Sequence, residues 1–424
     1  MTRLRQALTE RILVLDGAMG TMIQAASLSA ADFGGAALDG CNEHLNLTRP
    51  DVIRGIHAAY FDAGADIVST NTFGCAPYVL AEYGLGDRAY EITRAAAHLA
   101  REAAADRFVA GSLGPSTRTI TVTRNVTFDE VLDAYAIQTA GLIAGGVDAL
   151  LLETAQDTLN VKAAALGIRR AMREAGVELP LLLSATIEPM GTMLAGQAVD
   201  ALYVSVEHLA PFSIGLNCAT GPEFMTDHLR SLASIATCFV SVYPNAGLPD
   251  ERGHYGETPE SLAFKIRRFV DEGWVNIIGG CCGTTPAHIR ELAALVRGRA
   301  PRVPKREEPQ AVSGIEALFP TDDNRPIFVG ERTNVIGSRK FKELIVAEGF
   351  EDAAEIGRAQ VRAGAQVLDV CLANPDRDEG ADMDAFMTQL TRRVKVPLMM
   401  SRGAVVWSFS SRSSMRPSRL PSTM

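Results

Sequence analysis

The 424-residue sequence is 47% hydrophobic and 21% charged, which is enough apolar material for a large core in two or three domains. Its formal net charge of −9 argues against nucleic acid or an anionic membrane as a partner, since both are negative, and leaves small-molecule chemistry as the default. No apolar run is long enough to span a bilayer, and seven scattered cysteines do not resemble a secreted disulfide framework, so we expect a cytoplasmic protein.

Eight short apolar runs recur along the first 300 residues, each followed by an amphipathic helical stretch such as 50–62 or 128–144. This alternation is typical of an α/β protein with a parallel sheet, and eight units in this length predict one (β/α)₈ TIM barrel over residues 1–300. A doubly wound sheet with fewer strands would give the same rhythm. The predicted strands are 12–15, 66–70, 108–111, 149–152, 180–185, 213–216, 238–242 and 276–278.

A proline-rich, charged stretch at 301–314 is typical of a linker. A second βα rhythm follows over 315–400, with strands at 326–330, 366–370 and 394–400 and a helix at 350–363. Three units are too few to close a barrel, so we expect an incomplete second βα-barrel domain. Residues 401–424 contain eight serines, four arginines and no acidic residue, which indicates a disordered tail or the aberrant end of a truncated domain.

Three cysteines follow predicted strands: Cys218 in SIGLNCATG, and Cys281 with Cys282 in NIIGGCCGT. The carboxyl ends of barrel strands share one mouth, so the sixth and eighth strands bring three sulfurs together. Three protein ligands and one open position are typical of catalytic zinc. Glycines at 279, 280 and 283 would let the backbone turn both adjacent cysteines toward one ion. The alternatives are buried apolar cysteines or a vicinal disulfide; for the other four cysteines, Cys41, Cys75, Cys238 and Cys371, we expect buried apolar roles.

An all-thiolate zinc site favours a substrate that is itself a thiol. A free thiol has a pKa near 8.5, so only a few per cent is thiolate at neutral pH. A metal-bound thiol is deprotonated, which makes it a nucleophile.

The motifs LDGAMGT at 15–21, STNTF at 69–73, GSLGP at 111–115, LLLET at 150–154, GLNC at 215–218 and GGCCGT at 279–284 resemble the homocysteine S-methyltransferase family over about 10–300. The resemblance implies that Cys218, Cys281 and Cys282 bind Zn²⁺ and that the homocysteine sulfur completes the tetrahedron. It also implies that the loop from Asp16 to Thr21 holds the amino-acid end of homocysteine.

The other candidate substrate-binding residues lie beside the same strand ends. Small residues around Met19 would direct backbone N–H groups toward a carboxylate, or simply form a tight turn. Glu153 would accept the substrate ammonium, or cap the following helix. The rim residues Asn71, Thr72 and Ser112 would bind substrate or form hydrogen bonds to the loop backbone. We expect His57, His98 and His228 to lie away from the barrel mouth. The full candidate set is Asp16, Gly17, Ala18, Met19, Asn71, Thr72, Ser112 and Glu153, and we expect no catalytic group beyond the zinc site.

The segment PIFVGERTNVIGSRKF at 326–341 resembles the start of the pterin-binding domain of cobalamin-dependent methionine synthases, and AGAQVLDV at 363–370 resembles its second strand. This implies folate contacts for Thr333, Asn334 and Asp369, although Asn334 would equally shape a turn. Related proteins often carry Asn soon after the aspartate, whereas this chain has Cys371 there and Asn only at 374.

These resemblances imply methyl transfer from methyltetrahydrofolate through methylcobalamin to homocysteine. The sequence contains no Asp-x-His-x-x-Gly cobalamin motif, so a cobalamin-binding domain or protein would supply that cofactor. The alternatives are direct transfer from betaine or S-methylmethionine, whose enzymes lack the second segment, and a non-catalytic homocysteine- or zinc-binding fragment.

Overall fold

The computed structural model describes residues 2–251, 253–307, 309–402 and 405–409. Its contacts divide the chain into two compact units, residues 1–195 with 209–308, and residues 196–208 with 309–424.

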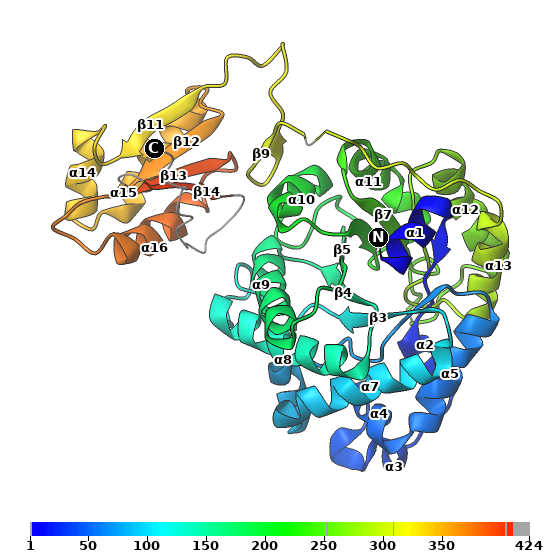
Figure 1. Cartoon of the computed structure of the whole chain (residues 1–424). Helices are drawn as coiled ribbons and strands as arrows, with labels where there is room; N and C mark the ends of the chain where they lie inside the picture. The colour runs from blue at the N-terminus through cyan, green and yellow to red at the C-terminus, as the bar shows by residue number, and fades with distance from the viewer. Residues whose placement is uncertain (1, 252, 308, 403–404, 410–424) are drawn as a thin grey trace. The chain divides into compact units, whose positions relative to one another are not determined.

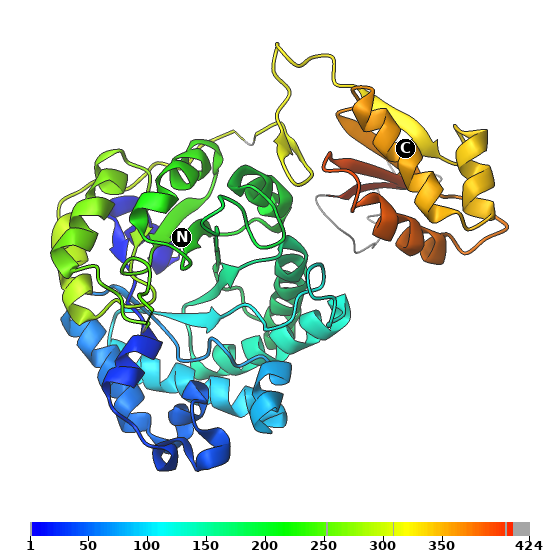
Figure 2. The same cartoon turned by 180° about the vertical axis from the view of Figure 1, so that it is seen from behind.

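The first unit is the predicted TIM barrel, seen as a ring of strands with helices outside it (Figures 1 and 2). All neighbouring strands are parallel, in the order β1-β8-β7-β6-β5-β4-β3-β2, and a bridge between Leu15 and Ile67 joins the two ends of the sheet. Every strand overlaps its predicted run. The strands are β1 Leu13–Val14, β2 Ile67–Ser69, β3 Phe108–Leu113, β4 Ala149–Ala155, β5 Leu181–Ala185, β6 Ser213–Asn217, β7 Phe239–Tyr243 and β8 Ile277–Ile278.

The long barrel helices begin at residues that favour helix starts. Proline occupies the first turn of the helices that begin at residues 50, 222, 259 and 286. Thr127 forms a capping box for the helix that begins at Phe128, and Asp157 caps the helix that begins at Thr158. These helices are α5 Pro50–Asp62, α7 Ala89–Ala104, α8 Phe128–Gly145, α9 Thr158–Ala175, α11 Pro222–Ile235, α12 Pro259–Asp271 and α13 Pro286–Val296. Among the described residues, no helix is both long and apolar enough to cross a membrane.

Shorter helices occupy the βα loops. The connection after β1 contains α2 Met19–Ala25, α3 Ala30–Phe33, η1 Ala36–Leu38, η2 Asn42–His44 and α4 Leu45–Thr48, and the connection after β2 contains α6 Pro77–Leu80, η3 Ala81–Tyr83 and η4 Gly86–Arg88. At the other end of the barrel, Leu4 and Leu8 of α1 (Arg3–Glu10) pack into the apolar core with Leu13, Phe108 and Phe212. Apolar side chains therefore close the amino ends of the strands.

The second unit contains a four-stranded sheet, β11 Val329–Asn334, β12 Val367–Cys371, β13 Leu398–Arg402 and β14 Val405–Phe409, in that order. The first three strands are parallel. Helices α14 Arg339–Val346, α15 Phe350–Arg362 and α16 Glu379–Leu390 contribute Phe341, Ala353 and Phe386 to its core. The unit also includes α10 Val199–Val206, η5 beginning at Glu207, and the hairpin of β9 Val312–Ser313 with β10 Ala317–Leu318.

Several boundaries differ from the sequence predictions. The strand predicted at 326–330 starts at Val329, where its pairing with β12 begins, and α14 was not predicted. The linker at 301–314 is partly ordered, because Arg302 is buried and Val312 begins β9. Within the tail at 401–424, predicted to be disordered or aberrant, residues 401–402 complete β13 and residues 405–409 form β14, which pairs antiparallel with β13. The remaining tail residues, 403–404 and 410–424, lie outside the described residues.

Candidate metal and substrate site

The three predicted cysteines meet at the barrel mouth, where they are the one cluster of potential metal ligands among the described residues. Their sulfur atoms lie within 4.8 Å of one another, and Sγ of Cys218 lies 3.9 Å from Sγ of Cys282. Ligand atoms bound at about 2.3 Å in a tetrahedral zinc site are about 3.8 Å apart. The sulfur spacing therefore fits a zinc ion with three thiolate ligands.

Backbone conformation directs these sulfurs inward. Cys218 and Ala219 both have left-handed conformations, with φ of 60° and 55°, which turns the chain sharply at the end of β6. Of the glycines expected to twist the second cysteine segment, Gly283 has a positive φ of 80°. Gly280 acts differently: an added Cβ would lie 2.4 Å from Oγ1 of Thr284, so glycine there permits close packing.

The end of β7 holds the two adjacent cysteines in place. The Cys281 N–H donates to the carbonyl of Pro244 (2.8 Å), and the Cys282 N–H donates to Oδ1 of Asn245 (3.1 Å). The Ala246 N–H in turn donates to the carbonyl of Cys282 (2.9 Å). Three hydrogen bonds therefore fix the segment that carries two of the sulfurs.

Asn217, immediately before Cys218, was missed by sequence reasoning. Its fully buried amide donates to Oγ1 of Thr154 (2.7 Å) and approaches Sγ of Cys281 at 3.9 Å, while its Oδ1 accepts from the Ser184 hydroxyl (2.6 Å). The amide thus links β4, β5 and β6 to the cysteine cluster. The available signal was a polar residue at the end of an otherwise apolar strand.

The cysteines also influence one another electrostatically. Hydrogen bonds from Cys218 and then Cys281 lower the pKa of the Cys282 thiol, despite its burial. Hydrogen bonds with Cys218 and Cys282, together with burial, raise the pKa of Cys281, so without a cation the cluster favours one negative charge, on Cys282.

Glu153 lies at the end of β4 with its carboxylate held by a neighbour. The Ser112 hydroxyl donates to Oε1 of Glu153 (2.5 Å), and burial raises the pKa of Glu153 to about 7, against this hydrogen bond. The alternative role as a helix cap is wrong, because Asp157 caps α9 by accepting from the Leu159 N–H.

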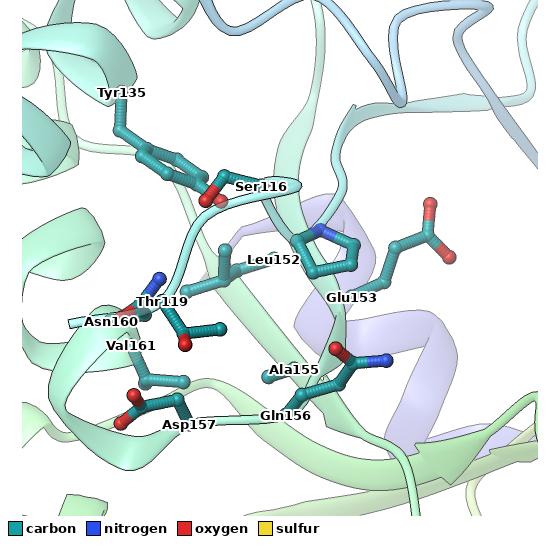
Figure 3. Close-up of a pocket in the computed structure, with 11 residues that line it drawn as sticks. Ser116, Thr119, Tyr135, Leu152, Glu153, Ala155, Gln156, Asp157, Asn160 and Val161 are labelled. Carbon is teal, nitrogen blue, oxygen red and sulfur yellow. The ribbon is translucent and has the colours of Figure 1, made fainter. Parts of the chain in front are cut away.

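A pocket lies between β4, the start of α9 and the loop after β3. Figure 3 shows its lining residues, with the Glu153 carboxylate pointing away from Asp157 and Asn160. The carboxylate is therefore directed away from the polar groups on the helix side of this pocket.

The loop after β1 is tied to the cysteine segment. The Ala18 N–H donates to Oγ1 of Thr284 (3.2 Å), so it is already used and is not free for a substrate carboxylate. A Cβ on Gly17 would lie 2.7 Å from that same Oγ1 and 2.9 Å from the Tyr60 hydroxyl, which explains the glycine. Tyr60 itself donates to the Ala18 carbonyl (3.0 Å).

Two further residues of the loop after β1 differ in their surroundings. Asp16 is buried and accepts from the Ser69 N–H (2.9 Å), and burial raises its pKa well above the usual value. Met19 begins α2, whose first turn has no side-chain cap, so N–H groups of this turn are not used by a capping side chain.

Two predicted rim residues support loops. Asn71 donates to the carbonyl of Asn42 (2.8 Å), and Thr72 donates to that of Ser112 (2.6 Å). His57 is buried in α5, whereas His98 is exposed on α7.

In the second unit, the three predicted folate residues come together. Nδ2 of Asn334 donates to Oδ2 of Asp369 (2.8 Å), and the Thr333 hydroxyl donates to the Asp369 carbonyl (2.6 Å). Oδ1 of Asn334 also accepts from the Ile336 N–H, so the residue shapes the turn as well.

Comparison with known proteins places this barrel in a family. A family model described as homocysteine S-methyltransferase matches residues 13–296, and the chain belongs to this family. Methionine synthase from Mycobacterium tuberculosis is 43% identical over 410 residues, and methionine synthase from Mycobacterium leprae is 42% identical over 415 residues. Each match covers 94% of this chain and 34% of the relative, so the chain spans about a third of the length of these curated relatives.

A solved structure supports the fold. The metallated form of the homocysteine methyltransferase MmuM from Escherichia coli has a TM-score of 0.56 and 23% identity, covering 69% of this chain and 99% of that one. The likeness confirms the barrel architecture.

Proposed function

We propose that the barrel binds Zn²⁺ through Cys218, Cys281 and Cys282 and activates the thiol of homocysteine for methylation to methionine. The observation that carries this proposal is the convergence of three sulfurs at tetrahedral spacing, with 3.9 Å between Cys218 and Cys282. Membership in the homocysteine S-methyltransferase family supports the choice of substrate.

The bound ion would supply an open coordination position at which the substrate thiol loses its proton and becomes a nucleophile. The chain's own part is to hold three sulfurs around that position. Asn217 orients Cys281 from one side, and the end of β7 fixes the backbone of Cys282. No other group in the barrel is assigned a catalytic role.

The amino-acid end of homocysteine would be held beside the sulfurs. We assign the ammonium group to Glu153, whose carboxylate is fixed by Ser112 in a poorly hydrated environment. We assign the carboxylate to the loop Asp16–Gly17–Ala18–Met19, with N–H groups at the start of α2 as donors, because the Ala18 N–H is already bound to Thr284. Asn71 and Thr72 would act indirectly by supporting the rim.

For the methyl group, we propose transfer from methyltetrahydrofolate through methylcobalamin. The curated relatives are methionine synthases, and the second unit brings Thr333, Asn334 and Asp369 together as a candidate folate contact. The cobalamin would come from a domain or protein outside these 424 residues. Assays with methylcobalamin, betaine and S-methylmethionine as donors separate this proposal from direct transfer, and methyl transfer from none of them would favour a homocysteine-binding role.

Proton release tests thiol activation directly. A free thiol is mostly protonated at pH 7 and a metal-bound one is not, so homocysteine binding should release about one proton. Calorimetry in buffers of different ionisation enthalpy measures this number, with the metal-free protein as control. A value near zero, together with X-ray absorption showing no added sulfur at zinc, would refute the proposal.

A further inference from the structure

The loop after β3, residues 114–126, crosses from the end of that strand to the start of α9 and is anchored at its first residue. The Gly114 N–H donates to the carbonyl of Phe73 (3.2 Å), and the Tyr135 hydroxyl of α8 donates to the Gly114 carbonyl (2.6 Å). A Cβ on Gly114 would lie 2.6 Å from the Phe73 carbonyl oxygen, so glycine permits this close approach. The loop therefore leaves the barrel mouth in a fixed direction.

Asp157 holds the middle of this loop. Its Oδ2 accepts from both the backbone N–H (3.0 Å) and the hydroxyl (2.6 Å) of Thr121. Its Oδ1 accepts from the Leu159 N–H (2.8 Å), so the same carboxylate caps α9. Asp157 is buried, and hydrogen bonds to an ionised acceptor are about twice as strong as those between neutral groups. One carboxylate thus joins the loop to the helix.

Asn160, three residues further along the chain, adds two contacts. Its Oδ1 accepts from the Ile120 N–H (2.9 Å), and its Nδ2 donates to the Arg118 carbonyl (2.9 Å). The loop is also braced internally, since the Thr119 hydroxyl accepts from the Thr123 N–H (2.8 Å). This part of the loop is therefore a compact turn fastened to the start of α9 by two side chains.

The fastened loop forms one wall of the pocket beside Glu153. Thr119 lines this pocket from the loop, and Asp157 lines it from the start of α9 (Figure 3). Glu153 lines it from the end of β4, with its carboxylate pointing away from Asp157 (Figure 3). Ser112, whose hydroxyl holds that carboxylate, lies at the end of the strand that leads into the loop. A displaced loop would therefore open the space beside Glu153 and loosen its hydrogen-bond partner.

We propose that Asp157 is a positioning residue for homocysteine, which latches the loop after β3 onto α9 so that the loop limits water around Glu153 and keeps its carboxylate directed to the substrate. This inference rests on the proposed function, in which Glu153 receives the substrate ammonium. A charged hydrogen bond is stronger where water is excluded, so an unlatched loop weakens this contact without altering a residue that touches the substrate. Most of the lost affinity should come from faster dissociation.

Conservative variants separate the latch from the helix cap. Asp157→Asn keeps an oxygen that caps α9, since Asn and Asp are equally good at this position, but an NH₂ group replaces the acceptor for Thr121. Thr121→Val removes the hydroxyl donor alone and leaves the cap untouched. The matched controls are Thr117→Val, whose hydroxyl is exposed in the same loop, and Asp133→Asn, which is exposed on α8.

Hydrogen exchange and binding kinetics give the two readouts. In Asp157→Asn, the Thr121 amide should exchange about 10-fold faster or more, because its hydrogen bond to a charged group is lost, while α9 keeps its wild-type protection. Homocysteine should dissociate about 2- to 10-fold faster, the effect of one ordinary hydrogen bond. Thr121→Val should show smaller changes in the same direction, and both controls should match the wild type.

The outcomes separate this inference from the proposed function. Faster exchange in the loop with an unchanged dissociation rate would refute the role in substrate positioning, and unchanged exchange in Asp157→Asn would refute the latch itself. If Asp157→Asn also loosens α9, Thr121→Val decides between these results, because its cap is intact. If wild-type protein does not bind homocysteine, the proposed function fails and the positioning role with it, whatever the exchange of the loop.

Discussion

The Ser112 hydroxyl donates a 2.5 Å hydrogen bond to the Glu153 carboxylate, joining the ends of β3 and β4 at the barrel mouth. The two residues are 41 positions apart in the sequence, and the parallel register of Gly111 with Leu150 and Ser112 with Leu151 brings them together. The contact fixes a half-buried carboxylate in one orientation, which suits it to receive a cation.

Replacing Glu153 by Gln should weaken homocysteine binding and leave zinc in place. The change keeps the side-chain shape but removes the charge that faces the ammonium group, and a charged hydrogen bond contributes about 1.5–3 kcal/mol, or roughly 10- to 150-fold in affinity. Calorimetry measures the dissociation constant, with the exposed Glu178→Gln as control. An unchanged constant in Glu153→Gln would contradict the assignment.

Wild-type protein should contain about one zinc ion per chain, and Cys218→Ala, Cys281→Ala and Cys282→Ala should each lose it. Two remaining thiolates are fewer than the three protein ligands that a catalytic site requires. Metal analysis after dialysis gives the stoichiometry, and Cys238→Ala, outside the cluster, should retain zinc. Full zinc content in all three cluster variants would show that the site lies elsewhere.

His57 should make the folded state sensitive to acid. Burial lowers its pKa from 6.5 to about 4, and neither ring nitrogen has a hydrogen-bond partner within the described part of the chain. Since protonation is less favourable in the folded state, the stability contribution is fully present above about pH 6.5 and is lost as the pH falls toward 4. At pH 5 the loss in the free energy of unfolding is about 2 kcal/mol.

Urea unfolding at pH 7 and pH 5 measures this contribution. His57→Leu should reduce the loss of stability between the two pH values by about 2 kcal/mol, whereas His98→Leu, on the exposed face of α7, should not. Equal pH dependence in wild type and His57→Leu would show that another group is responsible.

Arg302 should stabilise the closed end of the barrel. Its buried guanidinium donates to the carbonyls of Ala233 (2.8 Å), Ala236 (2.5 Å) and Cys238 (2.9 Å), beside the end of α11. Arg302→Met leaves these acceptors without that partner, and we expect a loss of about 3 kcal/mol in the free energy of unfolding. Arg299→Met is the control, because Arg299 is half exposed and forms a surface ion pair with Asp271, so its loss should be under about 1 kcal/mol. Equal losses would contradict a special role for Arg302.

Sequence periodicity was sufficient for the barrel because each strand is a buried apolar run between amphipathic helices, and all eight strands were located from it. Sequence periodicity predicted the strands of the second unit less accurately. There β11 begins three residues later than predicted, and β14 lies in a window whose serine-rich composition indicated disorder.

The sequence by itself determined the type of chemistry at the mouth: three cysteines after strand ends, in motifs that resemble one family, identify the sulfur cluster. Only the tertiary structure decided which polar groups surround it. Asn217, Tyr60 and Thr284 lie far from one another in the chain, and their contacts depend on strand register and on loop backbone that reverses direction. Local patterns record which face of an element is buried, whereas a hydrogen bond between loops depends on positions set by the whole closed barrel.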